Sequence, residues 1–255
     1  MQAFTLSRKE MSALLLSLTE KSEREPLHIL QEAWAKFHQE EVRKGRSLTA
    51  FLSTDIPPVL QKIIKGNKIN GLSLADIAAL GKLIEYSTLS ATAMQNWVKR
   101  DFKEYLGSPR LGRKYSVNQA ALLFIIDDLK ASLDFESIRQ LFRILFLQPE
   151  RDDDDLVQPV ELYYGYAELF EDIKRSPALQ AQGIAERSAG NSYSWKTDST
   201  LRGAMEKMMD RLTHLNWSEK DAVRNMLMIA AISVQTCYFQ ALARQYCNAA
   251  LFLDF

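Results

Sequence analysis

Six basic side chains lie close together in the middle of this sequence: Lys99, Arg100, Lys103, Arg110, Arg113 and Lys114. Only Asp101 and Glu104 oppose them, which leaves a local excess of four positive charges in a chain whose formal net charge is zero. Charge that gathers on one small module is typical of a surface that binds phosphates. Because the whole chain is neutral, any binding to nucleic acid should be confined to this stretch.

The segment that precedes most of this charge has the pattern of a short amphipathic helix after Ser90. The Ser90 hydroxyl is suited to cap its first turn, and Met94, Trp97 and Val98 have the spacing of a buried face. The outward positions include Thr92, Gln95, Asn96 and Lys99. Amide side chains can read adenine in the major groove, and a lysine can reach guanine or phosphate. These four residues are therefore candidate base-contacting positions.

Gly107, Pro109 and Gly112 predict that a loop follows, from Asp101 to Lys114. In the DNA-binding interpretation, Arg100 and Lys103 add positive charge at its start. The phosphates are then held by Arg110, Arg113, Lys114 and Tyr115. The other interpretation is that all these charges are solvated and that the same scaffold docks a protein.

Helices are expected on both sides of this module. Before it, Ser73 and Asp76 form a capping signature for a helix that would be the first of a helix-turn-helix, with a turn at Ser87 and Thr88. After it, Ser116 caps a helix whose run 120–126 is apolar on every side and must be buried. Asp134 then caps a helix with apolar residues at i, i+3, i+4 and i+7.

This succession resembles the winged helix-turn-helix of MerR-type regulators. The matching places are Leu89-Ser90, Trp97, Pro109-Arg110 and Arg113-Lys114-Tyr115. The sequence departs from the MerR pattern at Gln95 and Asn96, where that pattern has Arg and an aromatic residue, and at Asp101-Phe102, where it has Gly-Leu. The wing is thus more MerR-like than the recognition helix.

A closer resemblance is to an uncharacterised bacterial family that shares a domain of unknown function. It rests on SATAMQNWVKRDFKEYLG and GRKYSVNQAALLFIIDDLKASLDFESIR, and it extends from about Leu72 over most of the chain beyond. The resemblance implies a MerR-like DNA-binding domain in a cytoplasmic protein. It implies no particular operator or effector.

The whole chain of 255 residues reads as an all-α protein in four parts. Residues 1–70 form a helical arm that packs on the DNA-binding module or on a partner, residues 71–147 the MerR-like winged helix-turn-helix, residues 148–159 an acidic linker, and residues 160–255 a C-terminal helical domain. In the arm, Ser7 and Glu10 form a capping box, a second helix is expected from about Glu25 to Lys44, and a third from Pro57 to Gly66.

The run Asp152 to Asp155 is interpreted as a solvated linker in preference to a cation site, because it lacks the spaced carboxylates and glycine turn of oxygen-ligand loops. Beyond it, the aromatic and methionine residues of 160–251 form either a core or an effector pocket. A last helix is expected from a cap at Ser218 to about Leu251. Its apolar stretch 226–234 should be wrapped by other helices, within the domain or across a dimer interface.

These features favour a sequence-specific DNA-binding transcriptional regulator that acts as a homodimer on double-stranded DNA. We expect the C-terminal helices to form the pairing, with the N-terminal arm as the alternative. The alternative function is that of a helical protein–protein interaction module. No catalytic triad, glycine-rich phosphate loop or zinc spacing is evident, so we expect no enzyme activity, no cofactor and no metal. No signal peptide and no full membrane span are evident in the sequence. Cys237 and Cys247 are too far apart on one helix to form a disulfide. We therefore expect a cytoplasmic protein that does not enter a membrane.

Overall fold

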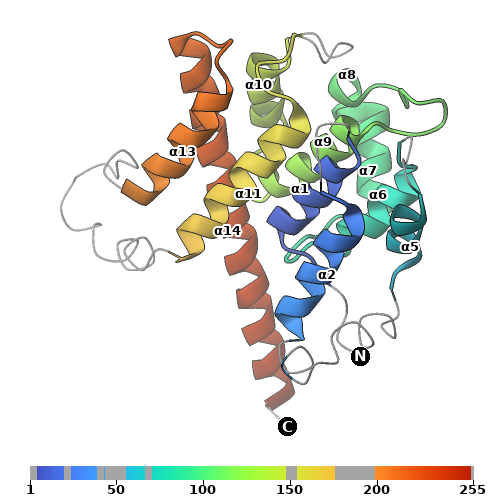
Figure 1. Ribbon diagram of the computed structural model, residues 1–255. Coiled ribbons are helices and arrows are strands. Elements are labelled where there is room, and N and C mark those ends of the chain that lie inside the picture. Colours follow the sequence, from blue (N-terminus) through green and yellow to red (C-terminus); the bar gives the residue numbers. More distant parts are fainter. Residues whose placement is uncertain are drawn as a thin grey trace. The chain divides into compact units, whose positions relative to one another are not determined.

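The computed structural model describes residues 5–19, 24–38, 43, 56–66, 71–147, 154–175 and 199–253. Within these ranges every regular element is a helix, and the β-type pairing consists of isolated bridges (Figure 1). The predicted all-α class is therefore confirmed for the described chain. The chain divides into two compact units, residues 1–127 with 159–161 and residues 128–158 with 162–255. The boundary between the two units falls inside the helix Val117–Leu129. The division into four parts expected from the sequence stays a prediction.

The first unit is built from short helices that precede one longer buried helix. They are α1 (Arg8–Ser17), α2 (Pro26–Phe37), α5 (Pro58–Lys65), α6 (Leu74–Gly81), α7 (Ala91–Asn96), the π-helix η1 (Trp97–Asp101), α8 (Lys103–Leu106) and α9 (Val117–Leu129). The α9 run 120–126 is buried at every position, as its sequence predicts. This helix therefore belongs to the core on all its sides.

Side-chain caps set the beginnings of the helices where the sequence places them. Ser7 and Ser73 each form a full capping box, with Glu10 and Asp76 respectively. The Ser90 hydroxyl accepts from the Ala93 amide, 3.1 Å away, at the start of α7. Each cap satisfies an amide that has no partner inside its helix. The predicted starts of α1, α6 and α7 are thus confirmed.

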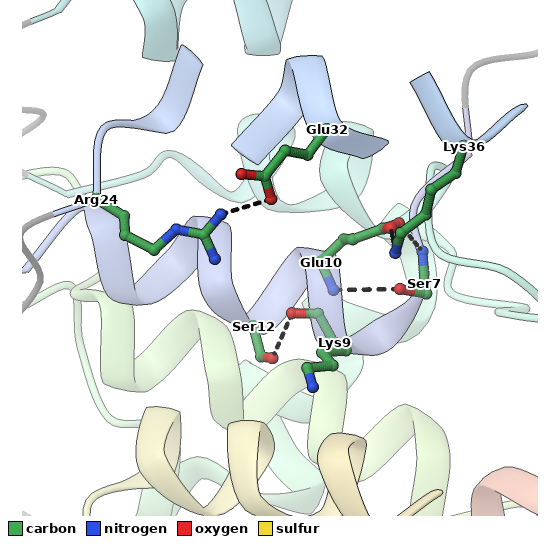
Figure 2. A network of polar contacts seen from close by, with 7 residues as sticks. All are labelled: Ser7, Lys9, Glu10, Ser12, Arg24, Glu32 and Lys36. Atoms are coloured by element: carbon green, nitrogen blue, oxygen red, sulfur yellow. Dashed lines mark hydrogen bonds and ion pairs between the residues drawn. The ribbon is translucent and has the colours of Figure 1, made fainter. Parts of the chain in front are cut away.

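A polar network joins α1 to α2 (Figure 2). The Glu10 carboxylate accepts from the Ser7 amide at 2.9 Å and also from the ammonium group of Lys36. Arg24, just before α2, donates to Glu32 on that helix at 2.6 Å. The prediction that this helix continues to about Lys44 is wrong, because α2 ends at Phe37 and His38, which follows it, is not helical.

The N-terminal segment is attached to the turn that follows α6. The Leu6 amide donates to the Leu83 carbonyl at 2.7 Å, and the Glu85 amide donates to the Leu6 carbonyl at 3.0 Å. The buried Arg8 guanidinium donates to the Glu85 carbonyl at 2.7 Å. The start of the expected helical arm therefore packs on the segment 71–147, which is one of the two expectations for it.

The second unit contains α10 (Phe135–Leu145), α11 (Pro159–Arg175), α13 (Ser199–Arg211) and α14 (Trp217–Leu253). Asp134 caps α10 through the Ser137 amide at 2.8 Å, as predicted. Tyr166 on α11 is fully buried and donates to Asp128 at 2.8 Å. An added Cβ at Gly165 would lie only 2.2 Å from the Met208 sulfur. The glycine thus leaves space for the end of the Met208 side chain, which comes from α13.

The aromatic and methionine residues of this unit pack mainly in its core. Tyr163, Tyr166 and Phe170 on α11 are all buried, as are Met205 and Met209 on α13. Their burial agrees with the core interpretation of their spacing. The effector-pocket interpretation of the same residues stays a prediction.

One expectation for α14 requires correction. The cap is Asn216, whose side chain accepts from the Glu219 amide at 3.0 Å while Glu219 accepts from the Asn216 amide at 2.8 Å; Ser218 lies inside the helix. An Asn with a Glu three residues later is the same reciprocal cap that begins α1, placed two residues earlier than expected. The stretch 226–234 is mostly buried, but Ile232 is 53% exposed, so the helices of its own unit do not cover it completely. The other expectation, that a dimer interface covers the rest, stays a prediction.

Helix α14 is long and apolar enough to cross a membrane when judged by length and composition alone. In the relevant window, 44% of the residues are buried inside the protein, and the core helix of a soluble protein passes the same test.

Of the acidic run, Asp154 and Asp155 are described and half-buried, and Asp152 and Asp153 lie outside the described chain.

Candidate nucleic-acid interface

The basic stretch begins within the helical run 91–106, which is formed by α7, η1 and α8. This run is longer than the sequence indicates. A loop is expected from Asp101 to Lys114, but η1 continues α7 to Asp101, and α8 begins at Lys103. The loop prediction is therefore wrong for its first half. Gly107, with φ of +57°, ends α8, and the irregular segment starts there.

A π-turn explains why this run stays helical past a charged residue. The Phe102 amide donates to the Trp97 carbonyl, five residues earlier, at 2.9 Å. An uninterrupted α-helix would turn Asp101 toward the core after Met94 and Trp97. The additional residue of the π-turn moves the fully buried Phe102 to that place and leaves Asp101 partly exposed. A search of the sequence for apolar residues at the α-helical period of 3.6 residues cannot detect the additional residue of the π-turn.

The candidate positions on this run all face solvent. They are Thr92 and Gln95 on the first turns, Asn96 at the end of α7, Lys99 and Arg100 on η1, and Lys103 on α8. Met94, Trp97 and Phe102, by contrast, are buried and anchor the run to the core. The outward face predicted for α7 is thus exposed in the structure.

A tight hairpin presents the remaining basic residues. Leu111 and Lys114 exchange two backbone hydrogen bonds, at 3.0 and 3.2 Å, around the two-residue loop Gly112-Arg113. Gly112 has φ of +67°, whereas the φ of Arg113 is negative, which is the pattern of a type II′ turn with glycine first. Arg113 is therefore at the exposed tip, with Arg110 exposed just before the hairpin and Lys114 half-buried within it.

The base of the hairpin is joined to the residues before α6. Tyr115 and Leu72 exchange backbone hydrogen bonds at 2.8 and 2.9 Å. Tyr115 is only 8% exposed, and burial raises the pKa of its phenol. Gly71, with φ of +80°, lies so close that an added Cβ would be 2.8 Å from the Tyr115 carbonyl oxygen. Tyr115 thus positions the hairpin and offers little surface to a phosphate.

Gln119 on α9 holds the irregular segment in place. Its side-chain amide donates to the carbonyls of Leu106 and Ser108, at 2.5 and 2.8 Å. Its side-chain oxygen accepts from the amides of Ser116, at 2.9 Å, and Arg110, at 3.4 Å. With 1% exposure, Gln119 is a buried polar group whose amide is fully used. It fixes both ends of the segment that carries Arg110.

Gln119 is absent from the sequence-based candidates, although a local signal for it exists. Ser116 and Gln119 have the spacing of a capping box, and the Gln119 backbone amide does donate to the Ser116 hydroxyl at 3.2 Å. The bonds to Leu106 and Ser108 carry no sequence signal, because they depend on how the preceding loop returns to α9.

The two helices that precede the hairpin pack at close range. An added Cβ on Gly81, the last residue of α6, would lie 2.5 Å from a Leu89 methyl group just before α7. Between them, the Ser87 hydroxyl donates to the buried Asp127 carboxylate at 2.7 Å and accepts from the Leu89 amide at 3.1 Å. The turn itself lies at 82–86, earlier than the one expected at Ser87 and Thr88, and these contacts hold the irregular segment that follows it.

Five of the six cations of this region form no ion pair within the described residues and are available for an external anion. Among the residues that the structure describes, no ion pair involves Lys99, Arg100, Lys103, Arg113 or Lys114. In the same part of the chain, no three His, Cys, Asp or Glu side chains are grouped as a metal site. The arrangement presents positive charge and side-chain amide groups on one exposed surface that Gln119 and the buried residues of the helical run hold in place.

Comparison with known proteins places this surface inside a recognised domain. Residues 72–166 match the model of DUF1836, a domain of unknown function. The chain is also similar to the uncharacterised protein YkrK of Bacillus subtilis strain 168, with 32% identity over 247 residues that cover 96% of this chain and 97% of YkrK. The chain belongs to the same family as YkrK and contains a DUF1836 domain. No solved structure matches it.

The DUF1836 match begins at Leu72, the residue that pairs with Tyr115, and ends at Tyr166, which is buried on α11. It thus contains α6, the helical run, the hairpin and α9 with Gln119. The resemblance to an uncharacterised family with a domain of unknown function is confirmed.

Proposed function

We propose that this DUF1836 protein binds double-stranded DNA in a sequence-specific manner and regulates transcription as a cytoplasmic homodimer. The binding module is a MerR-like winged helix-turn-helix formed by α6, the helical run 91–106, and the hairpin around Arg113. The observation that carries the proposal is a set of exposed cations that form no ion pair within the described chain: Lys99, Arg100, Lys103 and Arg113. Trp97 and Gln119 hold the run and the segment before the hairpin against the core.

In this proposal the helical run lies in the major groove. Gln95 and Asn96 are exposed amides on successive positions, suited to pairing with adenine, and Thr92 contacts a base edge one turn earlier. Lys99 reaches guanine or phosphate from η1. Arg100 and Lys103 extend the positive surface toward the backbone of the duplex.

The hairpin supplies the wing. Arg113 is at its tip, and Arg110 and Lys114 lie beside it, so the three cations follow one phosphate backbone. Tyr115 supports them from below through its bonds to Leu72 and is not assigned a phosphate. Six basic contacts in one module give an expected slope of about −5 for log K against log salt.

A dimer accounts for useful affinity, because a single helix-turn-helix module contacts one half-site. Two modules related by a two-fold axis read an inverted repeat, and the spacing of its halves reflects the distance between the modules.

The test is selection of genomic DNA fragments by the purified full-length protein, followed by salt titration on the enriched fragments. The proposal expects a short inverted repeat whose affinity falls steeply with salt. Asn96→Ala should relax sequence preference while affinity for unrelated DNA changes little. Weak binding without enrichment would overturn the proposal and favour the alternative, a helical module that binds another protein.

A further inference from the structure

Helix α14 carries a row of exposed large apolar residues at intervals of seven. They are Ile232, Phe239 and Tyr246, exposed by 53%, 57% and 70%. Three such side chains at a strict seven-residue spacing form a continuous seam along one face of a helix. In Figure 1 the helix extends beyond α10, α11 and α13 toward its C-terminus.

This seam lies on the side of α14 that faces away from its own unit. At about 100° per residue, the buried Ala230, Val234 and Cys237 lie roughly 140–180° around the helix from it. After Arg224, the remaining charged residue of α14 is Arg244, about 140° from Phe239. An apolar row of this kind, free of charge over several turns, is a surface by which helices pair.

A small residue follows each large one after four positions. Thr236, Ala243 and Ala250 come after Ile232, Phe239 and Tyr246, respectively. Large and small side chains thus alternate along the same ridge, because positions i and i+4 lie one above the other. A partner with the inverse alternation would fill each small position with a large side chain.

A second copy of the same helix, run in the opposite direction, provides that inverse alternation. With a two-fold axis at the level of Ala241, Phe239 of one copy faces Ala243 of the other. About the same axis Ile232 faces Ala250 and Thr236 faces Tyr246, so every large residue meets a smaller one. A parallel pair in register would instead set each large residue against its own copy.

We propose that α14 pairs with α14 of a second copy in an antiparallel two-helix seam centred at Ala241. Antiparallel packing also sets opposite ends of the two helix dipoles side by side. Large side chains that enter the spaces above small ones give the close packing of knobs into holes. The pairing deepens the dimer of the proposed function and rests on it, but its test uses no DNA, so either can fail without the other.

One edge of the seam is fixed by the unit itself. The half-buried Thr236 accepts a hydrogen bond from the Ser132 hydroxyl at 3.2 Å, within the same unit. The second copy therefore meets Thr236 from its free side, and the seam is most open from Phe239 onward, where positions 243–251 are all exposed.

The available area indicates a weak but specific dimer. Two aromatic rings that are more than half exposed contribute on the order of 100–200 Å² each, and Ile232 adds to them. A standard interface buries about 800 Å² on each partner, so these three side chains fall below it, in the class of weak, transient contacts. The dimer should therefore form with rising protein concentration.

The first test is the mass of the full-length protein by sedimentation at increasing concentration. The mass should rise from 29.1 kDa toward twice that value. Phe239→Asp should abolish this rise, and Ala243→Arg should do the same because it fills the space opposite Phe239. Leu251→Asp is the matched control: Leu251 is 62% exposed on the same helix but lies about 120° around it from Phe239, and this change should leave the mass unaltered.

Circular dichroism of each variant verifies that the monomer stays folded. A wild-type protein that remains a monomer at every concentration would overturn the proposal. Loss of the dimer in Leu251→Asp as well as Phe239→Asp would overturn the proposed register. Sedimentation of the monomer with lipid vesicles would overturn it in favour of a membrane as the occupant of this face.

The direction of the pair is tested with a short bis-maleimide linker. Cys247 is exposed and Cys237 is buried, so the linker reacts selectively at position 247. In the antiparallel pair the two Cys247 residues are offset by about 18 Å along the axis, whereas two cysteines at position 243 are offset by about 6 Å. Ala243→Cys in a Cys247→Ser background should cross-link and the wild type should not; rapid cross-linking of wild type would overturn the antiparallel arrangement.

Discussion

The Gln119 side-chain amide donates to the Ser108 carbonyl at 2.8 Å, which connects the buried α9 to the segment that leads into the hairpin. The same side chain also donates to the Leu106 carbonyl and accepts from the amides of Arg110 and Ser116. One buried residue thus holds the part of the proposed DNA surface that has little regular secondary structure of its own.

Gln119→Ala should destabilise the protein by about 1–3 kcal/mol, because it leaves buried backbone groups without partners. Chemical denaturation measures the change. Gln140→Ala is the control, since Gln140 is exposed and its bond to Glu136 is long, at 3.4 Å. Equal, small effects of the two changes would show that Gln119 does not hold the segment.

Gly81→Ala should destabilise the contact between α6 and α7, because its Cβ would lie 2.5 Å from Leu89. We expect a loss on the order of 1–3 kcal/mol in the free energy of unfolding. Gly203→Ala on α13 is a matched control with nothing within 4 Å of its Cβ, and it should stabilise the protein by up to about 1 kcal/mol. A stabilised Gly81→Ala variant would contradict the close approach of these helices.

Gly112→Ala isolates the conformation of the hairpin tip. Nothing lies within 4 Å of the added Cβ, but φ of +67° is unfavourable for an L-residue. The cost should be about 1–2 kcal/mol. Gly112→Asn, which tolerates this conformation better, should recover part of the loss. Thermal unfolding compares the two variants, and an Ala variant as stable as the wild type would rule out the left-handed turn.

Acid should weaken the start of α6. Burial alone would raise the pKa of Asp76, but hydrogen bonds from Lys62 and Ser73 and the charge of Lys62 outweigh it and hold the pKa below its usual value of 3.8. A carboxyl with a lowered pKa in the folded protein stabilises it above pH 3.8, and this contribution is lost as the pH falls through the lowered pKa. Asp76→Asn should flatten the dependence of unfolding free energy on pH in this window, measured by denaturation at a series of acid pH values.

The sequence is sufficient to predict those features that depend on neighbouring residues. Ser7, Ser73, Ser90 and Asp134 are recognisable as caps, and each is confirmed, because a cap needs only a suitable side chain close to the first amides of a helix. The buried run of α9 follows from its continuous apolarity. These signals depend only on residues that are close in the sequence, and the structure agrees with each of them.

Features that depend on distant residues or on an altered period are not predictable in the same way. The π-turn at Trp97 shifts the helical phase by one residue, and the bonds of Gln119 to Leu106 and Ser108 arise only after the chain returns to α9. The cap of α14 is a different case, since Asn216 and Glu219 do carry a local signal and the prediction of Ser218 is wrong. The exposed seam of α14 depends on which face the rest of the unit covers.

The most direct test of the central claim compares Arg113→Ala with Arg211→Ala on a selected DNA fragment over a range of salt concentrations. Both arginines are exposed, but Arg211 ends α13 and lies outside the proposed surface. Arg113→Ala should weaken binding to all sequences and reduce the salt slope by about 1 for each module, while Arg211→Ala should match the wild type. Equal affinities and equal slopes for all three proteins would contradict a DNA-binding hairpin.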